Sequence, residues 1–246
     1  MSSLYLNNFP IINLYKKPSI KSEVVTQMIF GEGFKIINKS ARWLKIEIKE
    51  DKYIGYIKNN NFFFYVRPTH KVSVVSANIY KNPNFKNKST RLPYASKIKI
   101  ERKNKKFSKF LNGWIETKNI KPINYKNNNI FKDIKIFKET KYTWGGKTFK
   151  GIDCSALIQV CLNFNNQFCP RDSGQQVIFF KKNINLKNIR KNDIIYWKGH
   201  VAVALSKKKL IHAYGPKKKT IIMNISKTIK LIKKTANLEV ISVKRI

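Results

Sequence analysis

A glycine-led turn that runs directly into an apolar helix constrains this chain more than any other feature. The run Gly151-Ile152-Asp153-Cys154-Ser155-Ala156-Leu157-Ile158 places a cysteine where the turn becomes helix. At a helix N-terminus the backbone N–H groups are unpaired and the helix dipole is positive, which favours a thiolate. Asp153 and Ser155 are polar neighbours that a packed core thiol rarely has. The pattern therefore predicts that Cys154 is a nucleophile.

The other two cysteines have different surroundings. Cys161 lies between Val160 and Leu162, and Cys169 precedes Pro170, so both fit the role of buried structural thiols. Three cysteines without a CxxC pair argue against a disulfide framework.

Two of the three histidines follow the nucleophile in strand-like surroundings. His200 and His212 are twelve positions apart, and Ser206–Lys208 is the expected turn between them. If the hairpin loop has an odd length or a bulge, both imidazoles project from one face. His200 then serves as the base for Cys154, and His212 holds its tautomer. A zinc site formed by these three residues is the weaker alternative, because their spacing is not that of a metal finger; we expect no metal and no cofactor.

The charge of the chain suggests nucleic-acid binding, but its distribution does not. Fifty-one Lys and Arg against 13 Asp and Glu give a net charge of +38. The excess is mainly lysine, accompanies abundant Asn and Ile in every segment, and lacks an RNA-binding or helix-turn-helix signature. Compositional bias with a solvated surface explains this better, so we expect no specific nucleic-acid partner.

The composition and the N-terminal residues bear on the compartment. With 42% hydrophobic residues the chain can fill real cores, and no run of eighteen apolar residues predicts a membrane span. The first residues show no basic region followed by an apolar stretch and a small-residue cleavage site. We therefore expect a cytoplasmic protein with no membrane partner; the oligomeric state stays unknown.

The first half of the chain is predicted to form short strands. Leu44, Ile46 and Ile48 alternate with Lys45 and Glu47, as a half-buried strand requires. Repeated short strands with turn residues between them predict a small barrel over residues 1–66. The order of these strands, with Gly31-Glu32-Gly33 and a Tyr-x-Gly-aromatic run at Tyr53–Tyr56, resembles a bacterial SH3-type domain.

Residues 67–124 echo the first segment. Asn78-Ile79-Tyr80 matches Asn13-Leu14-Tyr15, and Asn112-Gly113-Trp114-Ile115 matches Ile54-Gly55-Tyr56-Ile57. This repeat predicts two related SH3-like barrels in tandem.

From residue 125 the pattern changes to α+β. Helix-like spacing appears at Ile130–Thr140, Cys154–Phe164 and Gly174–Lys182, and strand-like runs follow at 193–197, 201–205 and 209–214. Helices first and an antiparallel sheet afterwards fit a papain-like domain over 125–246.

Five motifs in order make the chain resemble the NlpC/P60 family of cysteine peptidases. They are Tyr-Thr-Trp-Gly-Gly (142–146), Gly-Ile-Asp-Cys-Ser (151–155), Pro-Arg-Asp-Ser (170–173), Trp-Lys-Gly-His-Val (197–201) and Leu-Ile-His-Ala (210–213). The resemblance implies an α+β, papain-like catalytic domain behind two all-β, SH3-like barrels. It is nearest to the subgroup that hydrolyses the γ-D-glutamyl–diamino acid bond of cell-wall peptides.

The same resemblance implies roles for further residues. Tyr142 matches a tyrosine close to the nucleophile, where its hydroxyl donates to the oxyanion; packing beside Trp144 is the alternative. Asp153, Ser155, Asp172, Ser173, Glu32 and Tyr53 match positions that bind the amino-terminus of the substrate. For Glu32 the alternative is an ordinary turn glutamate, and Arg171 has two candidate partners, Asp172 or a substrate carboxylate.

Together these features predict a cysteine endopeptidase that acts on small murein peptides with a free N-terminal L-Ala, in peptide recycling. Acylation of that amine is expected to lower kcat/KM on the order of a hundredfold. A peptide-binding module without activity and a papain-like acyltransferase are the alternatives.

Overall fold

The computed structural model describes residues 3–111 and 113–246. Met1, Ser2 and Asn112, which fall in the two predicted barrels, lie outside the described residues. The chain divides into two compact units. The N-terminal unit comprises Met1–Lys126, Lys147–Phe149 and Asn163–Asn166, and the C-terminal unit comprises Asn127–Gly146, Lys150–Leu162 and Gln167–Ile246. The predicted domain limits at 66/67 and 124/125 stay predictions.

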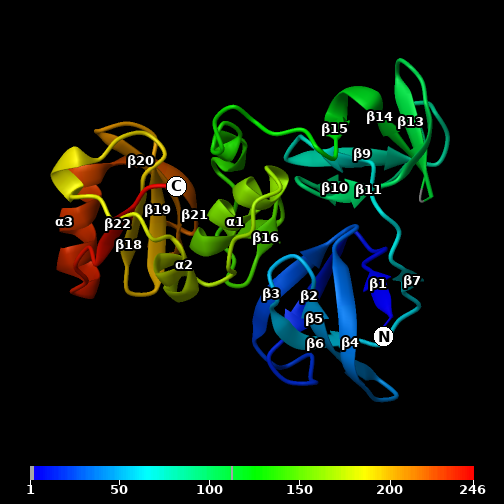
Figure 1. Cartoon of the computed structure of the whole chain (residues 1–246), viewed down its shortest axis with the longest axis horizontal. Helices are drawn as coiled ribbons and strands as arrows, with labels where there is room; N and C mark the ends of the chain where they lie inside the picture. Colours follow the sequence, from blue (N-terminus) through cyan, green and yellow to red (C-terminus); the bar gives the residue numbers. More distant parts are fainter. Residues whose placement is uncertain (1–2, 112) are drawn as a thin grey trace. The chain divides into compact units, whose positions relative to one another are not determined.

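The first sheet of the N-terminal unit has seven strands in the order β3-β2-β6-β5-β4-β1-β7 (Figure 1). Its strands are β1 (Leu4–Leu6), β2 (Ile11–Tyr15), β3 (Val24–Ile29), β4 (Gly33–Lys39), β5 (Trp43–Ile48), β6 (Ile54–Lys58) and β7 (Phe63–Phe64). The alternation predicted for β5 is confirmed, because Leu44, Ile46 and Ile48 are buried in the core of this sheet.

The second β-rich region consists of two sheets, β10-β9-β14-β13-β12 and β11-β8-β15. Its elements are β8 (His70–Val72), β9 (Ser76–Tyr80), β10 (Lys88–Pro93), β11 (Lys97–Ile98), β12 (Ile100–Lys103), β13 (Phe107–Phe110), β14 (Gly113–Glu116), the 3-10 turn η1 (Thr117–Asn119) and β15 (Ile120–Pro122). Their core includes Ile79, Phe110 and Ile115, and Phe30 from the first region packs into it.

The internal echo in the sequence corresponds to equivalent strand pairs. In the first region Tyr15 of β2 lies opposite Tyr56 of β6, and in the second Tyr80 of β9 lies opposite Trp114 of β14. Both pairs join the two motifs that the sequence repeats. The predicted sheet-rich character of both regions is therefore confirmed, whereas their closure into two related barrels stays a prediction.

The C-terminal unit is built on the antiparallel sheet β21-β20-β19-β18-β22. Its elements are η2 (Ile134–Phe137), β17 (Gly151–Ile152), α1 (Cys154–Phe164, which ends in the N-terminal unit), α2 (Ser173–Phe179), η3 (Leu186–Asn188), β18 (Ile194–Trp197), β19 (His200–Ala204), β20 (Lys209–Tyr214), η4 (Gly215–Lys217), β21 (Lys219–Asn224), α3 (Ile225–Ala236) and β22 (Ser242–Lys244). The short strand β16 (Lys147–Thr148) lies in the N-terminal unit. Apolar side chains of α3 pack on one face of the sheet, including Ile225 and Ile232.

One predicted helix is much shorter than expected. Residues 130–140 contain only the 3-10 turn η2 over Ile134–Phe137. The buried residues Phe131, Ile134 and Phe137 recur every three positions, which is the period of a 3-10 helix rather than that of an α-helix. Among the described residues, no helix is both long and apolar enough to cross a membrane.

Candidate active site

The candidate nucleophile begins helix α1, and the residue before it caps that helix. The carbonyl oxygen of Asp153 accepts from Leu157 N, and its Oδ1 accepts from Ala156 N at 2.8 Å. Asp153 is therefore the N-cap, and Cys154 is the first residue of the helix. Cys154 is buried and carries a free thiol. The predicted position of Cys154 at a helix start is confirmed.

Burial opposes the thiolate that the helix N-terminus was expected to favour. The pKa of Cys154 is raised to about 12, chiefly by burial and then by the charge of Asp153. The backbone N–H groups of Val201 and Ser155 and the Arg171 guanidinium lower this pKa, but by less. The helix end contributes, yet burial outweighs it, so the thiol needs a base.

The two histidines contact each other, as the hairpin argument predicts. Strands β19 and β20 pair in the register Val203↔Ile211 and Ala204↔Leu210, so the loop between the last pair has an odd length. His200 Nε2 lies 2.9 Å from His212 Nδ1. The ring of His212 stacks on Tyr214 at a centroid distance of 4.6 Å.

A sulfur atom selects the tautomers of this pair. His212 Nε2 lies 3.4 Å from Met223 Sδ, and a thioether only accepts hydrogen bonds. His212 Nε2 therefore carries the proton, and its Nδ1 accepts from His200 Nε2. This assignment leaves the unprotonated Nδ1 of His200 to act as the base. The sequence analysis did not select Met223, because a methionine in an apolar strand looks like an ordinary core residue.

Burial keeps both imidazoles neutral. It lowers the pKa of His200 to about 4 and that of His212 to about 3, the latter also because of His200. A neutral imidazole beside a neutral thiol is the starting state for general-base activation.

Arg171 joins the residues that flank the nucleophile. Its guanidinium contacts both carboxylate oxygens of Asp153, at 3.0 and 2.5 Å, and Nη1 lies 2.9 Å from Ser155 Oγ. Gly145 N also donates to Asp153 at 3.0 Å. All four residues are buried. Arg171 is therefore paired with Asp153, a partner that the sequence did not suggest, and the proposed contacts to Asp172 or a substrate carboxylate stay predictions. The polar residues on either side of the cysteine, Asp153 and Ser155, were the sequence signal for a charged partner.

Buried Gln176 of α2 is a second residue that the sequence did not single out. Its Nε2 donates to Ser155 O and Pro170 O at 3.0 and 2.9 Å, which ties α2 to the first turn of α1.

Tyr142 lies in the electrostatic neighbourhood of the thiol. Burial raises the pKa of its hydroxyl, and Cys154 and Asp153 raise it further. Tyr142 is half-buried and Trp144 is 62% exposed, and packing between the two stays the alternative to an oxyanion role. The oxyanion role of Tyr142 stays a prediction.

Asp172 and Ser173 mark the start of α2. Asp172 is exposed at the position before the helix, and its carbonyl oxygen accepts from Gln175 N and Gln176 N. Ser173 is half-buried as the first helical residue. Of the three carboxylates predicted to bind an amine, Asp172 is the exposed one.

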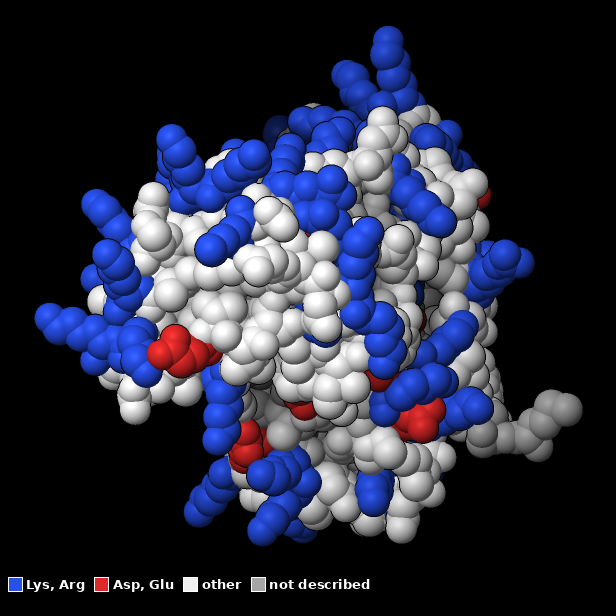
Figure 2. All heavy atoms as spheres, turned by 60° about the vertical axis from the view of Figure 1, so that its left-hand side comes forward, with Lys and Arg blue, Asp and Glu red and all other residues white. Residues whose placement is uncertain are grey.

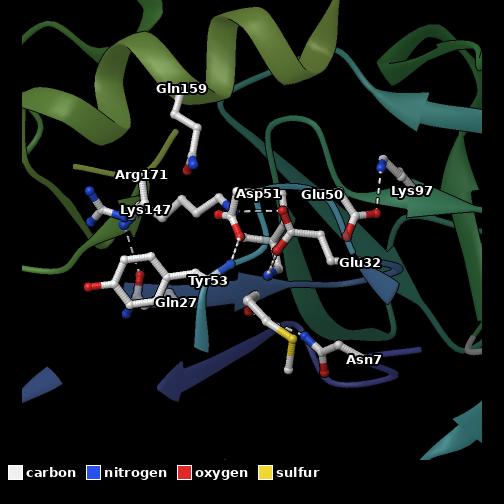
Figure 3. A network of polar contacts seen from close by, with 12 residues as sticks. Asn7, Gln27, Glu32, Glu50, Asp51, Tyr53, Lys97, Lys147, Gln159 and Arg171 are labelled. Atoms are coloured by element: carbon white, nitrogen blue, oxygen red, sulfur yellow. Dashed lines mark hydrogen bonds and ion pairs between the residues drawn. The ribbon is translucent and has the colours of Figure 1, made fainter. Parts of the chain in front are cut away.

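Glu32 and Tyr53 lie in the N-terminal unit, within a network of polar contacts (Figure 3). Glu32 is buried, and its Oε1 contacts Lys147 Nζ at 2.6 Å while its Oε2 accepts from Ile29 N at 2.8 Å. Tyr53 is half-buried, and its N–H donates to Asp51. The binding roles predicted for both residues stay predictions.

On the face shown in Figure 2, lysine and arginine side chains are spread over the surface in several groups with uncharged areas between them. Within residues 3–111 and 113–246, no group of three or more His, Cys, Asp or Glu side chains is arranged to hold a metal ion.

A cysteine at a helix start, whose thiol accepts from the backbone N–H of Val201 next to His200, and a hydrogen-bonded histidine pair are the groups that a thiol hydrolase uses. Residues 139–236 match the NlpC/P60 family, and residues 14–62 match the bacterial dipeptidyl-peptidase SH3 domain. The chain therefore carries an NlpC/P60 peptidase domain behind a bacterial SH3 domain.

Individual relatives agree with this assignment. The chain is 23% identical over 229 residues to dipeptidyl-peptidase 6 of Lysinibacillus sphaericus, which covers 82% of this chain and 84% of that protein. It is 34% identical over 79 residues to a probable endopeptidase NlpC homolog of Haemophilus influenzae, 30% of this chain and 42% of that protein. The crystal structure of an NlpC/P60 family protein from Bacillus cereus shares the fold over 99% of each chain, with a TM-score of 0.85 and 18% identity.

Proposed function

We propose that this protein is a cysteine endopeptidase that cleaves the γ-D-glutamyl–diamino acid bond of murein peptides. The observation that carries the proposal is the 2.9 Å contact between His200 Nε2 and His212 Nδ1. The Cys154 thiol accepts from the backbone N–H of Val201. Val201 directly follows His200, so one strand presents both the base and a donor to the thiol.

The reaction follows from this arrangement. His200 Nδ1 takes the proton of Cys154 as the sulfur attacks the γ-glutamyl carbonyl carbon. The backbone N–H of Cys154 and the Tyr142 hydroxyl donate to the oxyanion. His200 then protonates the amine of the diamino acid, which leaves. Water attacks the thioester, and the thiol is regenerated.

We propose peptides with a free amino-terminus as the preferred substrates. The relative from L. sphaericus is called a dipeptidyl-peptidase, a term for enzymes that release dipeptides from a free amino-terminus. Asp172 is the exposed carboxylate of the proposed set, and a charge-assisted hydrogen bond from an ammonium group contributes about 1.5–3 kcal/mol. One such contact predicts about a tenfold preference for the free tripeptide over its N-acetylated form. This is less than the hundredfold effect expected when three carboxylates bind the amine.

A free-peptide substrate fits the recycling of released wall fragments in the cytoplasm, which we propose as the setting. Cell fractionation with an antibody to the protein tests it: the protein is expected with cytoplasmic markers, and recovery in the wall fraction would contradict it.

Mass spectrometry of products from L-Ala-γ-D-Glu-diaminopimelate tests the activity. We expect L-Ala-D-Glu and free diaminopimelate from the wild type and none from Cys154→Ala. Wild-type protein that binds the peptide without cleaving it would identify a binding module. Transfer of the glutamyl group to an added amine in place of water would identify an acyltransferase.

A further inference from the structure

Gln176 of α2 is a fully buried glutamine whose side-chain amide is bonded to the main chain beside the nucleophile. The residue is 0% exposed, and its Nε2 donates to Ser155 O at 3.0 Å and to Pro170 O at 2.9 Å. Both acceptors are backbone carbonyls, which have no hydrogen to donate, so the nitrogen and not the oxygen of the amide must face them. The amide therefore uses both of its hydrogens on these two carbonyls.

The oxygen of the same amide is buried without a hydrogen-bond partner among the described residues. A buried polar atom that lacks a partner destabilises the folded state. A methionine at position 176 would fill a similar volume without this cost. Stability alone therefore does not account for a glutamine here, and the two donated hydrogen bonds are what the amide adds.

The two carbonyls belong to the two segments that fix the nucleophile turn. Ser155 follows the nucleophile and lies in the first turn of α1. Pro170 directly precedes Arg171, whose guanidinium holds Asp153, the N-cap of α1. Gln176 thus joins the nucleophile turn to the segment that supplies the cation paired with its cap.

We infer that Gln176 is a positioning residue, which holds the first turn of α1 where the Cys154 thiol meets its base. The inference rests on the proposed function, in which His200 takes the proton of that thiol. Gln176 acts through the main chain of Ser155 and not by contact with the reacting atoms. A displacement of about 1 Å at a reacting group can lower the rate about a hundredfold, so the loss of two such bonds acts on kcat rather than on KM.

Gln159 provides a matched control in the same helix as the nucleophile (Figure 3). It is also 0% exposed, and its Nε2 donates to Cys169 O at 3.1 Å. Cys169 immediately precedes Pro170, so the two glutamines are bonded to neighbouring carbonyls of one segment. The bond from Gln159 reaches this segment and not the nucleophile turn. Gln159→Met therefore removes a buried amide of the same kind but leaves the bond to Ser155 O in place.

The test measures kcat and KM for the free tripeptide in Gln176→Met and Gln159→Met, with urea titrations to show that both variants are folded. We expect Gln176→Met to lower kcat about tenfold and to keep KM within about twofold of wild type. Gln159→Met should keep both parameters within about twofold. A wild-type kcat in folded Gln176→Met, or equal losses of kcat in the two variants, would overturn the inference.

Gln176→Asn provides a second test if Gln176→Met does not fold. Asparagine keeps a buried amide but is one methylene shorter, so it does not reach both carbonyls. We expect kcat to fall at least about threefold with KM unchanged, whereas Gln159→Asn should stay within about twofold of wild type. Wild-type kcat in Gln176→Asn would overturn the inference. Failure of the proposed function is distinct, since the wild-type protein itself would then not cleave the tripeptide.

Discussion

Two buried ion pairs among the described residues, Asp153–Arg171 and Glu32–Lys147, carry the same charges in different geometries. Arg171 forks across both oxygens of Asp153, which also accept backbone N–H groups of Gly145 and Ala156. Lys147 makes a single contact to one oxygen of Glu32. A guanidinium fork fixes orientation, whereas a lysine ammonium acts as a point charge on a flexible stem.

The difference separates two functions of a buried carboxylate. Asp153 holds the start of α1, so its pair sets the position of the thiol. Glu32 caps no helix. Lys147 neutralises the charge of its carboxylate, to which Ile29 N also donates. We therefore expect changes at Arg171 to lower kcat more than changes at Lys147.

The largest expected effect lies at the base. His200→Ala should lower kcat by about a thousandfold, because the thiol loses its proton acceptor and the leaving amine its acid. His212→Ala should cost less, since that residue only orients His200. Steady-state kinetics on the free tripeptide provide the comparison. A His200→Ala enzyme with wild-type activity would end the Cys–His mechanism.

Matched substitutions break the two pairs. Arg171→Met and Lys147→Met each leave a buried carboxylate without its cation, which should cost about 3–5 kcal/mol of unfolding free energy in urea titrations. In the folded variants, kcat should fall about a hundredfold for Arg171→Met and by less than about fivefold for Lys147→Met. Equal losses of kcat would remove the distinction drawn between the two pairs.

The pH dependence follows from the lowered histidine pKa values. His200 must be neutral to accept the thiol proton, and its pKa is about 4, so kcat/KM should hold from pH 7 to about 5 and fall below that. The unfolded chain protonates its histidines near pH 6.5. Between about 6.5 and 4 it binds more protons than the folded state, so stability should decrease as the pH falls. An acid limb centred at 6.5 would show that burial does not control the base.

The smallest effect is expected at the sulfur that selects the tautomers. Met223→Leu keeps the volume but removes the acceptor for His212 Nε2, so kcat should fall by about three- to tenfold with KM unchanged. Met223→Gln restores an acceptor and should recover part of the loss. If Met223→Leu matches the wild type, the sulfur has no orienting role.

Elements that local sequence patterns define were predictable. The buried positions of Leu44, Ile46 and Ile48 follow from period-two geometry, and the same geometry puts His200 and His212 on one face once the loop has an odd length. The partners of Arg171 and Lys147 were not predictable, because they are distant in the sequence. Arg171 and Asp153 are 18 positions apart, and Lys147 and Glu32 are 115 positions apart. The helix predicted over residues 130–140 was wrong for another reason. Apolar residues at every third position are compatible with an α-helix in a sequence, but here they form a 3-10 turn.

The assignment of Cys154 as nucleophile is tested most directly by trapping the acyl-enzyme. The wild type is mixed with the free tripeptide, quenched in acid during turnover, digested and analysed by mass spectrometry. We predict an L-Ala-γ-D-Glu thioester on the peptide that contains Cys154, absent in Cys154→Ala and retained in Cys161→Ala and Cys169→Ala. An adduct on Cys161 or Cys169, or turnover by Cys154→Ala, would contradict the account.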